Sequence, residues 1–111
     1  MDDYIKRVPA YTREALDAFL REGRPGGHFL KAVITGDLFA AFSRADGDNV
    51  REMKSIVMYI YNKFPRIAFG SEEAYDYWLQ LHQEGKVIWS EKEQRAYVDE
   101  LKGCTTYEEN C

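Results

Sequence analysis

The chain has 111 residues, of which 45% are hydrophobic and 31% are charged. This length corresponds to one domain, and the composition excludes a disordered or a fibrous chain. With 15 Lys and Arg against 19 Asp and Glu, the formal net charge of −4 gives no overall attraction to nucleic-acid phosphates, so nucleic acid is not an expected partner.

Location and metal binding follow from the ends of the chain and from its Cys and His residues. The first four residues form neither a basic leader nor an apolar run, and no later segment has the roughly 18–20 apolar residues that cross a bilayer. We therefore expect a cytosolic protein with no membrane partner, in which Cys104 and Cys111 are free thiols. Because His28 and His82 stand far apart without ligand spacing, we expect no metal site and no cofactor.

The N-terminal third predicts two or three helices. Thr12 is a candidate N-cap and Gly23 a stop for the first helix. Its apolar residues recur at helical spacing: Ala15, Leu16, Phe19 and Leu20. The Gly-rich connector 23–27 leads to an apolar segment, 29–34, and Asp37 is expected to begin a short helix. This short helix presents Leu38, Ala41 and Phe42.

Residues 49–64 carry the strongest helical pattern in the chain. Their apolar side chains follow the three-and-four spacing of a single helical face. They are Val50, Met53, Ile56, Val57, Ile60, Tyr61 and Phe64. Pro65 disfavours helical backbone at the residue before it, so the helix is expected to end at Phe64. We predict that this helix is the centre of the core.

Two further helices are expected after Pro65. Ser71 is the N-cap of the first, which Gly85 closes and whose buried stripe is Ala74, Tyr77, Trp78 and Leu81. A short extended segment, 86–89, precedes a capping box of Ser90 and Glu93, which predicts a last helix running to about Lys102. Residues 104–111 have no apolar periodicity and are expected to form a flexible tail.

The elements combine into one predicted architecture. We expect a single domain over residues 1–111 with an all-α fold, a compact bundle of about five helices around the amphipathic helix 49–64.

No motif with established chemistry emerges from this pattern. The Gly-rich run before His28 lacks the Gly-Lys-Ser/Thr ending of a phosphate-binding loop, although Arg24, His28 and Lys31 make it the most basic local patch and keep an anionic small ligand open. The acidic turn 43–49 has the wrong order for a calcium loop. Neither histidine stands in a setting typical of a nucleophile's base, so we expect no catalytic residues and no enzyme.

Polar-tipped rings are more numerous than one central helix and its neighbours can easily bury. These rings, together with the side-chain amide of Asn62, are Tyr59, Tyr61, Asn62, Tyr75, Tyr77, Trp78 and Trp89. Two interpretations stay open. The rings are boundary residues whose polar atoms reach water, or some of them form a self-association or binding surface, where Tyr and Trp are enriched.

Several short segments occur together in a familiar order. They are Val8-Pro9-Ala10-Tyr11-Thr12-Arg13, the run from Pro25 through Phe29 and Leu30 to Asp37-Leu38-Phe39, Arg44-Ala45-Asp46 with Asn49, Tyr61-Asn62 with Pro65, and Gly70-Ser71 with Trp78. This combination, over about residues 8–80, resembles a family of small phage and prophage helical proteins of undefined function. The resemblance implies a phage-type accessory protein in the host bacterial cytosol.

That setting leads to the functional hypothesis of counter-defence by binding, either by blocking a host protein or by sequestering a nucleotide second messenger. A nucleotide site needs cations for phosphate, a ring for stacking and polar groups for the sugar. The candidate ligand-binding residues are Arg13, Arg24, His28, Lys31, Arg44, Asp46, Asn49, Tyr61 and Asn62. Alternatively, the same residues cap helices and tie loops to the core.

The expected partners are the chain itself, as a homodimer or higher oligomer, and a host protein or an anionic nucleotide. A second hypothesis is a structural or regulatory interaction module of the phage cycle. Its DNA-binding version has less support, because the central helix offers only Arg51, Lys54 and Lys63 as cations.

Overall fold

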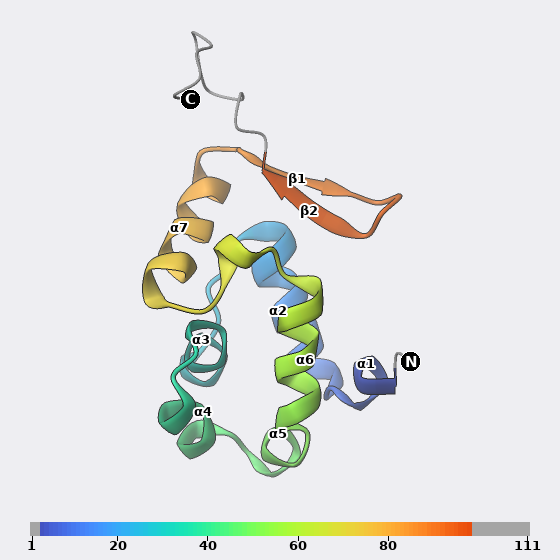
Figure 1. Cartoon of the computed structure of the whole chain (residues 1–111), viewed down its shortest axis with the longest axis vertical. Helices are drawn as coiled ribbons and strands as arrows, with labels where there is room; N and C mark the ends of the chain where they lie inside the picture. The colour runs from blue at the N-terminus through green and yellow to red at the C-terminus, as the bar shows by residue number, and fades with distance from the viewer. Residues whose placement is uncertain (1–2, 99–111) are drawn as a thin grey trace, which may run out of the picture.

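The computed structural model describes residues 3–98, which form seven α-helices, one 3-10 helix and one two-stranded sheet (Figure 1). The helices are α1 (Asp3–Arg7), α2 (Ala10–Glu22), α3 (His28–Thr35), α4 (Leu38–Arg44), α5 (Gly47–Arg51), α6 (Met53–Lys63), η1 (Arg66–Ala68) and α7 (Glu72–Gln83). The sheet pairs β1 (Val87–Ser90) with β2 (Arg95–Val98). The fold is therefore mainly helical, as predicted, but it is not all-α, and two of its helices, α1 and α5, are shorter than any we expected.

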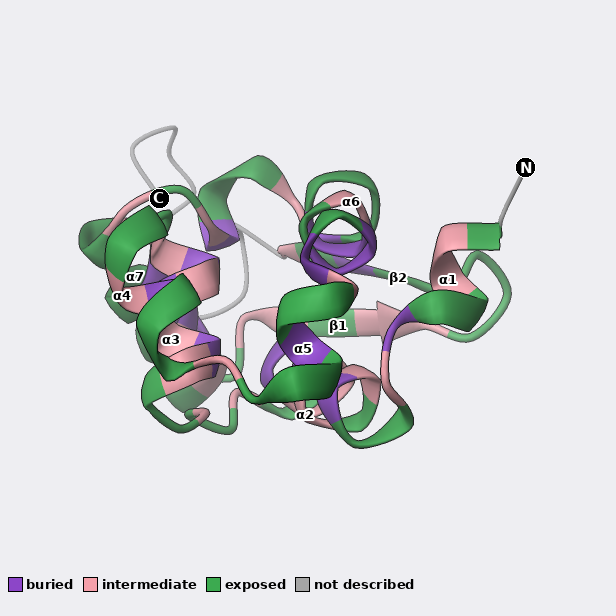
Figure 2. Ribbon diagram, turned by 90° about the horizontal axis from the view of Figure 1, so that it is seen from below, coloured by how far each residue is buried: buried purple, intermediate pink, exposed green. Residues whose placement is uncertain are grey.

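The core is built where α2, the end of α6 and α7 meet. The ring of Phe19 stacks on Phe64 and Tyr75, with ring centroids 5.8 and 4.9 Å apart. The indole Nε1–H of Trp78 donates to the backbone carbonyl of Phe19 at 3.2 Å, so the one polar atom of this buried ring is satisfied. In Figure 2 the buried residues of α2, α6 and α7 face the interior, and the outer surfaces of the helices are exposed.

The central helix differs from the prediction in length and in which face it buries. The backbone leaves the helical conformation at Glu52, where φ is −108° and ψ is 26°, so the predicted helix 49–64 is divided into α5 and α6. The buried members of the predicted stripe are Met53, Ile56, Ile60 and Phe64. The exposed members are Val50, Val57 and Tyr61. One helical face is too narrow to bury seven apolar positions, and the flanking ones are left at the surface.

Helix α7 begins and ends where the sequence predicts. The hydroxyl of Ser71 accepts the amide of Ala74 at 3.0 Å, which confirms the N-cap. Its buried face is turned slightly from the predicted one, because Tyr75 is buried and Tyr77 is exposed. At the start of α2, in contrast, the N-cap is Pro9; Thr12 lies inside the helix, and the N-cap predicted for it is wrong.

The last predicted helix is wrong. Residues 95–98 form β2, antiparallel to β1, with Ala96 buried and Arg95 and Tyr97 exposed in strict alternation. The Ser90 hydroxyl does accept the amide of Glu93, at 3.2 Å, but this bond closes the turn between the strands. A serine hydroxyl that accepts an amide three residues later occurs both at the start of a helix and in a turn. This bond alone therefore does not distinguish a helix over residues 90–102 from a hairpin. Residues 99–102 lie outside the described part of the chain.

The hairpin packs against the core through Ala96 and Trp89, and one arginine of α2 adds further contacts to it. The Arg21 guanidinium lies 4.3 Å from the centre of the Trp89 ring and pairs with Glu91 at 2.9 Å. Among residues 3–98, no helix is long and apolar enough to span a bilayer. The expected tail, 104–111, with both cysteines, lies outside the described residues.

The end of α2 provides a first test of the packing. Gly23 has a φ of 69°, and a Cβ atom there would lie 2.5 Å from both Cβ and Cγ of His82. We expect Gly23→Ala to lower the free energy of unfolding by about 1 kcal/mol through its left-handed backbone and by about 1–3 kcal/mol more through the clash. Gly85→Ala is the matched control, because Gly85 has a φ of 70° with no atom within 4 Å of the added Cβ. Urea denaturation of both variants measures the difference, and equal losses would contradict the close packing of His82 on Gly23.

His82 makes the stability depend on pH. Burial lowers its pKa, and a hydrogen bond from its Nε2–H to the carbonyl of Leu20, at 3.0 Å, opposes this shift without cancelling it. The unfolded chain therefore binds the proton more readily, and stability contributed by neutral His82 is lost as the pH falls below about 6.5. We expect the unfolding free energy of His82→Gln to decrease less than that of the native chain between pH 8 and pH 5, as measured by urea denaturation at each pH. Parallel curves would contradict this assignment.

Candidate functional site

A short connection places α4 against α3. Gly36 adopts a φ of 86° at the end of α3, and the amide of Asp37 donates to the Ala32 carbonyl at 2.8 Å. The Asp37 carboxylate then accepts the amide of Ala40 at 3.2 Å and caps α4, as the sequence predicts. With only two residues between the helices, α4 folds back on α3, where the small side chains of Ala32 and Ala41 lie in one buried cluster.

An apolar groove of about 210 Å³ lies between this helix pair and α6. Its lining comes from α3, the α3–α4 connection, α4, α6 and the residue that follows η1: Ala32, Val33, Ile34, Gly36, Asp37, Leu38, Ala41, Phe42, Met53, Val57, Ile60, Tyr61 and Phe69. Asp37 is the one charged residue in this lining. Residues of α4 and of α6 line the groove, and Figure 1 shows these two helices apart from each other.

The groove has a buried floor and an exposed rim. Ile34, Ala41 and Met53 of the floor are buried, whereas Val57 and Tyr61 on the rim are 50% and 64% exposed. The rim is rigidly placed, since α6 is fixed in the core by other residues and the Tyr61 ring lies edge-on to Phe69, 6.3 Å away. The groove is therefore an open, preformed apolar surface.

The exposed apolar surface continues from the rim over the outside of α4. Phe39 is 85% exposed, and Leu38 and Phe42 beside it are exposed as well. Sequence analysis assigned Leu38 and Phe42 to the helix but did not identify the surface. A signal was present, because five consecutive apolar residues, 38–42, stand on a seven-residue helix that cannot bury them all.

Two of the nine candidate ligand residues, Asp46 and Asn49, lie together and tie α5 to α2. Asp46 caps α5 by accepting the Asn49 amide at 2.8 Å, and its carboxylate also accepts the Tyr11 hydroxyl at 2.7 Å. These two hydrogen bonds lower the pKa of Asp46. The bond that the Tyr11 hydroxyl donates raises the pKa of Tyr11 to about 12. The buried Asn49 accepts the Thr12 hydroxyl at 2.6 Å.

Three of the candidate cations have partners within the chain. Arg24 pairs with Glu22 at 3.0 Å. Lys31 pairs with Glu72 at 3.3 Å, and its ammonium lies 5.4 Å from the centre of the Tyr75 ring. The Arg13 guanidinium donates to the Ile5 carbonyl at 3.4 Å.

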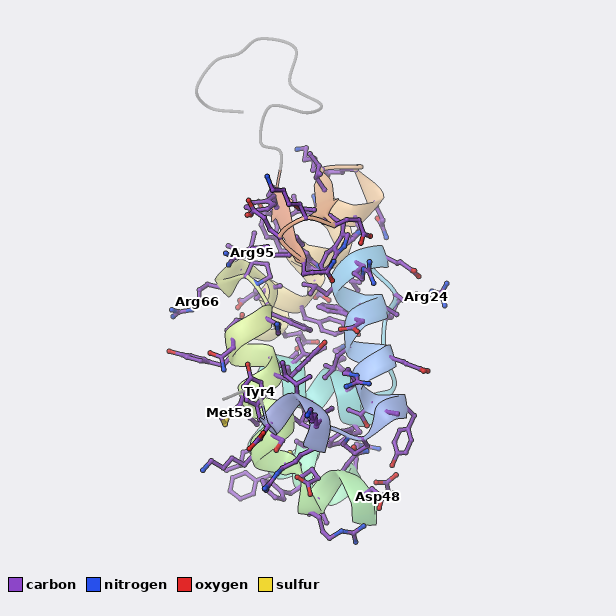
Figure 3. The ribbon with its side chains drawn as sticks, turned by 90° about the vertical axis from the view of Figure 1, so that its right-hand side faces the viewer. Tyr4, Arg24, Asp48, Met58, Arg66 and Arg95 are labelled. Carbon is purple, nitrogen blue, oxygen red and sulfur yellow. The ribbon has the colours of Figure 1, made fainter. Side chains whose placement is uncertain are left out.

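The candidate residues belong to several elements, and Figure 3 labels one of them, Arg24. Arg24 lies at the C-terminal end of α2, and Asp48 marks α5 at the opposite end of that helix. The remaining candidates are all exposed: His28 at the start of α3, Arg44 at the end of α4, and Tyr61 and Asn62 on α6. Tyr61 is the one candidate of the nine that lines the groove.

Three of the surplus rings are core residues, which neither interpretation predicted, and others are exposed. Tyr59, Tyr75 and Trp78 are buried, and the Tyr59 hydroxyl donates to the Asp17 carboxylate at 2.6 Å. Burial, followed by this hydrogen bond, raises the pKa of Tyr59. Tyr61 and Tyr77 are exposed, and of these Tyr61 belongs to the groove. Burial in the core therefore accounts for part of the set, and Tyr61 is available to a partner.

Across residues 3–98, no three His, Cys, Asp or Glu side chains are grouped so that they could hold a metal ion. Comparison of the chain with protein-family models, curated proteins and solved structures finds no match.

The contact between Thr12 and Asn49 gives a test of its structural role. Both side chains are buried, so Thr12→Val leaves the Asn49 amide oxygen without its donor, and we expect a loss of about 1–3 kcal/mol in unfolding free energy. In a double-mutant cycle with Asn49→Ala, the coupling energy should be about 1 kcal/mol. Tyr11→Phe, which removes the exposed neighbouring hydrogen bond, is the control and should have a smaller effect. Zero coupling would contradict the structural role.

Proposed function

We propose that this chain acts by binding another protein through the apolar groove between α4 and α6. The observation that carries this proposal is an apolar groove that opens to solvent and continues into exposed rings on α4. Contiguous exposed apolar surface of this kind is typical of interaction sites in soluble proteins. Aromatic anchors such as Phe39, Phe42 and Tyr61 are the side chains that dominate protein interfaces.

The size and chemistry of the groove favour a protein over a small molecule. Its volume of about 210 Å³ is below the roughly 300–1,000 Å³ of small-molecule sites, but it is large enough to receive side chains from a partner helix. A nucleotide would require cations near its phosphates, and the lining contributes one carboxylate, Asp37. The nucleotide hypothesis thus has less support than the protein hypothesis.

A phage-type accessory role, with a host protein as the target, is the setting that we propose for this binding. It is supported by the resemblance of residues 8–80 and by no feature of the groove. The groove would act without chemistry, since blocking a partner requires affinity alone.

Photocrosslinking in bacterial cells that express the protein tests the binding surface. We expect a photoreactive benzoyl-phenylalanine at Val57 to form covalent adducts with protein, because half of this side chain faces solvent on the groove rim. The matched control position is Ile88 of β1, which is 43% exposed and lies in the hairpin, away from α4 (Figure 1). Adducts are measured on denaturing gels and identified by mass spectrometry.

Two outcomes separate the possibilities. Adducts from position 57 that disappear when Phe42→Asp is introduced on the opposite rim would support the groove as the binding surface. No protein adduct from position 57, or the same adducts from positions 57 and 88, would overturn the proposal.

A further inference from the structure

The most exposed large apolar side chain of the described residues stands beside the groove. Phe39 is 85% exposed on α4, and its neighbours Leu38 and Phe42 form part of the groove lining. An aromatic ring left in water costs the hydrophobic free energy that its burial would recover, about 1.5–3 kcal/mol. Phe39 is thus an unburied knob, and the groove next to it is an unfilled hole.

The hole is suited to a knob of this size. A groove of about 210 Å³ with an apolar lining accommodates a large side chain, whereas a drug-sized ligand needs more volume. Its opening is flanked by Val57 and Tyr61, so a ring entering from outside would contact an aliphatic and an aromatic wall. The floor is already buried and needs no rearrangement to receive it.

Knob and hole belong to a single patch of one chain. In a two-fold symmetric dimer the same patch of both copies is in contact, so a residue of the first copy meets the hole of the second and the reverse. Phe39 cannot fill the groove of its own chain while it is 85% exposed, but it can fill that of a second copy. The arrangement closes after two copies and leaves no free knob.

A second copy meets little charge repulsion at the groove. Two copies with a net charge of −4 each repel, so a self-interface has to be formed by a surface with little charge. The groove lining contains Asp37 alone, and α4 contains Arg44 alone, at its last position. These two charges have opposite signs, so the groove lining and α4 together carry no net charge.

The exposed apolar area of the patch is comparable to the area that a dimer interface buries on each partner. Exposed apolar side chains on α4 and α6 form the surface around the groove: Leu38, Phe39, Phe42, Val57 and Tyr61. Together with the groove walls they offer several hundred Å², which approaches the roughly 800 Å² per partner of a standard interface. Such an interface gives a reversible dimer.

We propose that the occupant of the groove is Phe39 of a second copy of this chain, in a two-fold symmetric dimer formed by α4 and α6. This inference rests on the proposed protein-binding function and names its partner. Each Phe39 inserts between Val57 and Tyr61 of the other copy, so the dimer contains two equivalent contacts.

Native mass spectrometry and sedimentation equilibrium of the full chain measure the dimer. We expect the native protein to populate a species of twice the 12.9 kDa monomer mass. Phe39→Asp and, separately, Val57→Lys should each raise the dimer Kd by about 30-fold or more, which corresponds to about 2 kcal/mol. Both side chains are exposed in the monomer, so the variants should fold, which their circular dichroism verifies. Ile88→Lys is the control for an exposed apolar residue elsewhere and should leave the Kd unchanged.

Mixing the two variants tests whether the contact is reciprocal. In a heterodimer of Phe39→Asp with Val57→Lys, one of the two contacts is native and the other joins the introduced acid with the introduced base. The mixture should therefore form heterodimers more tightly than either variant forms homodimers. A heterodimer no tighter than the homodimers would overturn the insertion of Phe39 beside Val57.

The dimer and the binding function can fail separately. Native protein that is monomeric up to about 1 mM overturns the dimer. If position 57 then still forms adducts with a different protein, the proposed function stands and the second copy is excluded as its partner. If position 57 forms no adducts and the protein is monomeric, both proposals fail.

Discussion

The arrangement of the helices depends on the contacts of Phe19. Its ring stacks on Phe64 and Tyr75, and its carbonyl accepts the indole N–H of Trp78. These four residues are buried and come from three distant parts of the sequence, so their contacts fix α2, the end of α6 and α7 relative to one another. The other elements are attached to this unit, the hairpin through the buried Ala96 and the contacts of Arg21, and α5 through Asn49.

The groove exists because α4 packs along α3 and meets α6 near its start, where Ala41 and Met53 share one buried cluster. Ile34 is fully buried, and its carbonyl accepts the amide of Gly70 at 2.8 Å, which anchors the end of α3 to the segment before α7. Since only Gly36 and Asp37 separate α3 from α4, α4 is held close to α3 and packs on it. Ala41 is buried on the inner side of α4, whereas Phe39 and Phe42 stay exposed.

Two polar residues predicted to bind a ligand are structural, and apolar residues predicted to be buried line an open groove. Asp46 and Asn49 have the chemistry of ligand-binding residues, yet their hydrogen bonds to Tyr11 and Thr12 join α5 to α2 across 35 and 37 positions of the sequence. Apolar residues of α6 that were predicted to lie in the core form the open groove together with residues of α4. A buried hydrogen bond satisfies a polar group completely, whereas an exposed ring is stabilised by a partner that covers it.

The sequence by itself determined the helical class and the local boundaries at Gly23, Asp37, Pro65 and Ser71, because caps and breakers act on backbone within a few residues. Only the tertiary structure decided which apolar stripe of residues 53–64 is buried. It also decided that Ser90 begins a turn between strands and that α4 stands beside α6. These outcomes depend on surfaces brought together from distant segments, and local periodicity carries no information about which surface a side chain will meet.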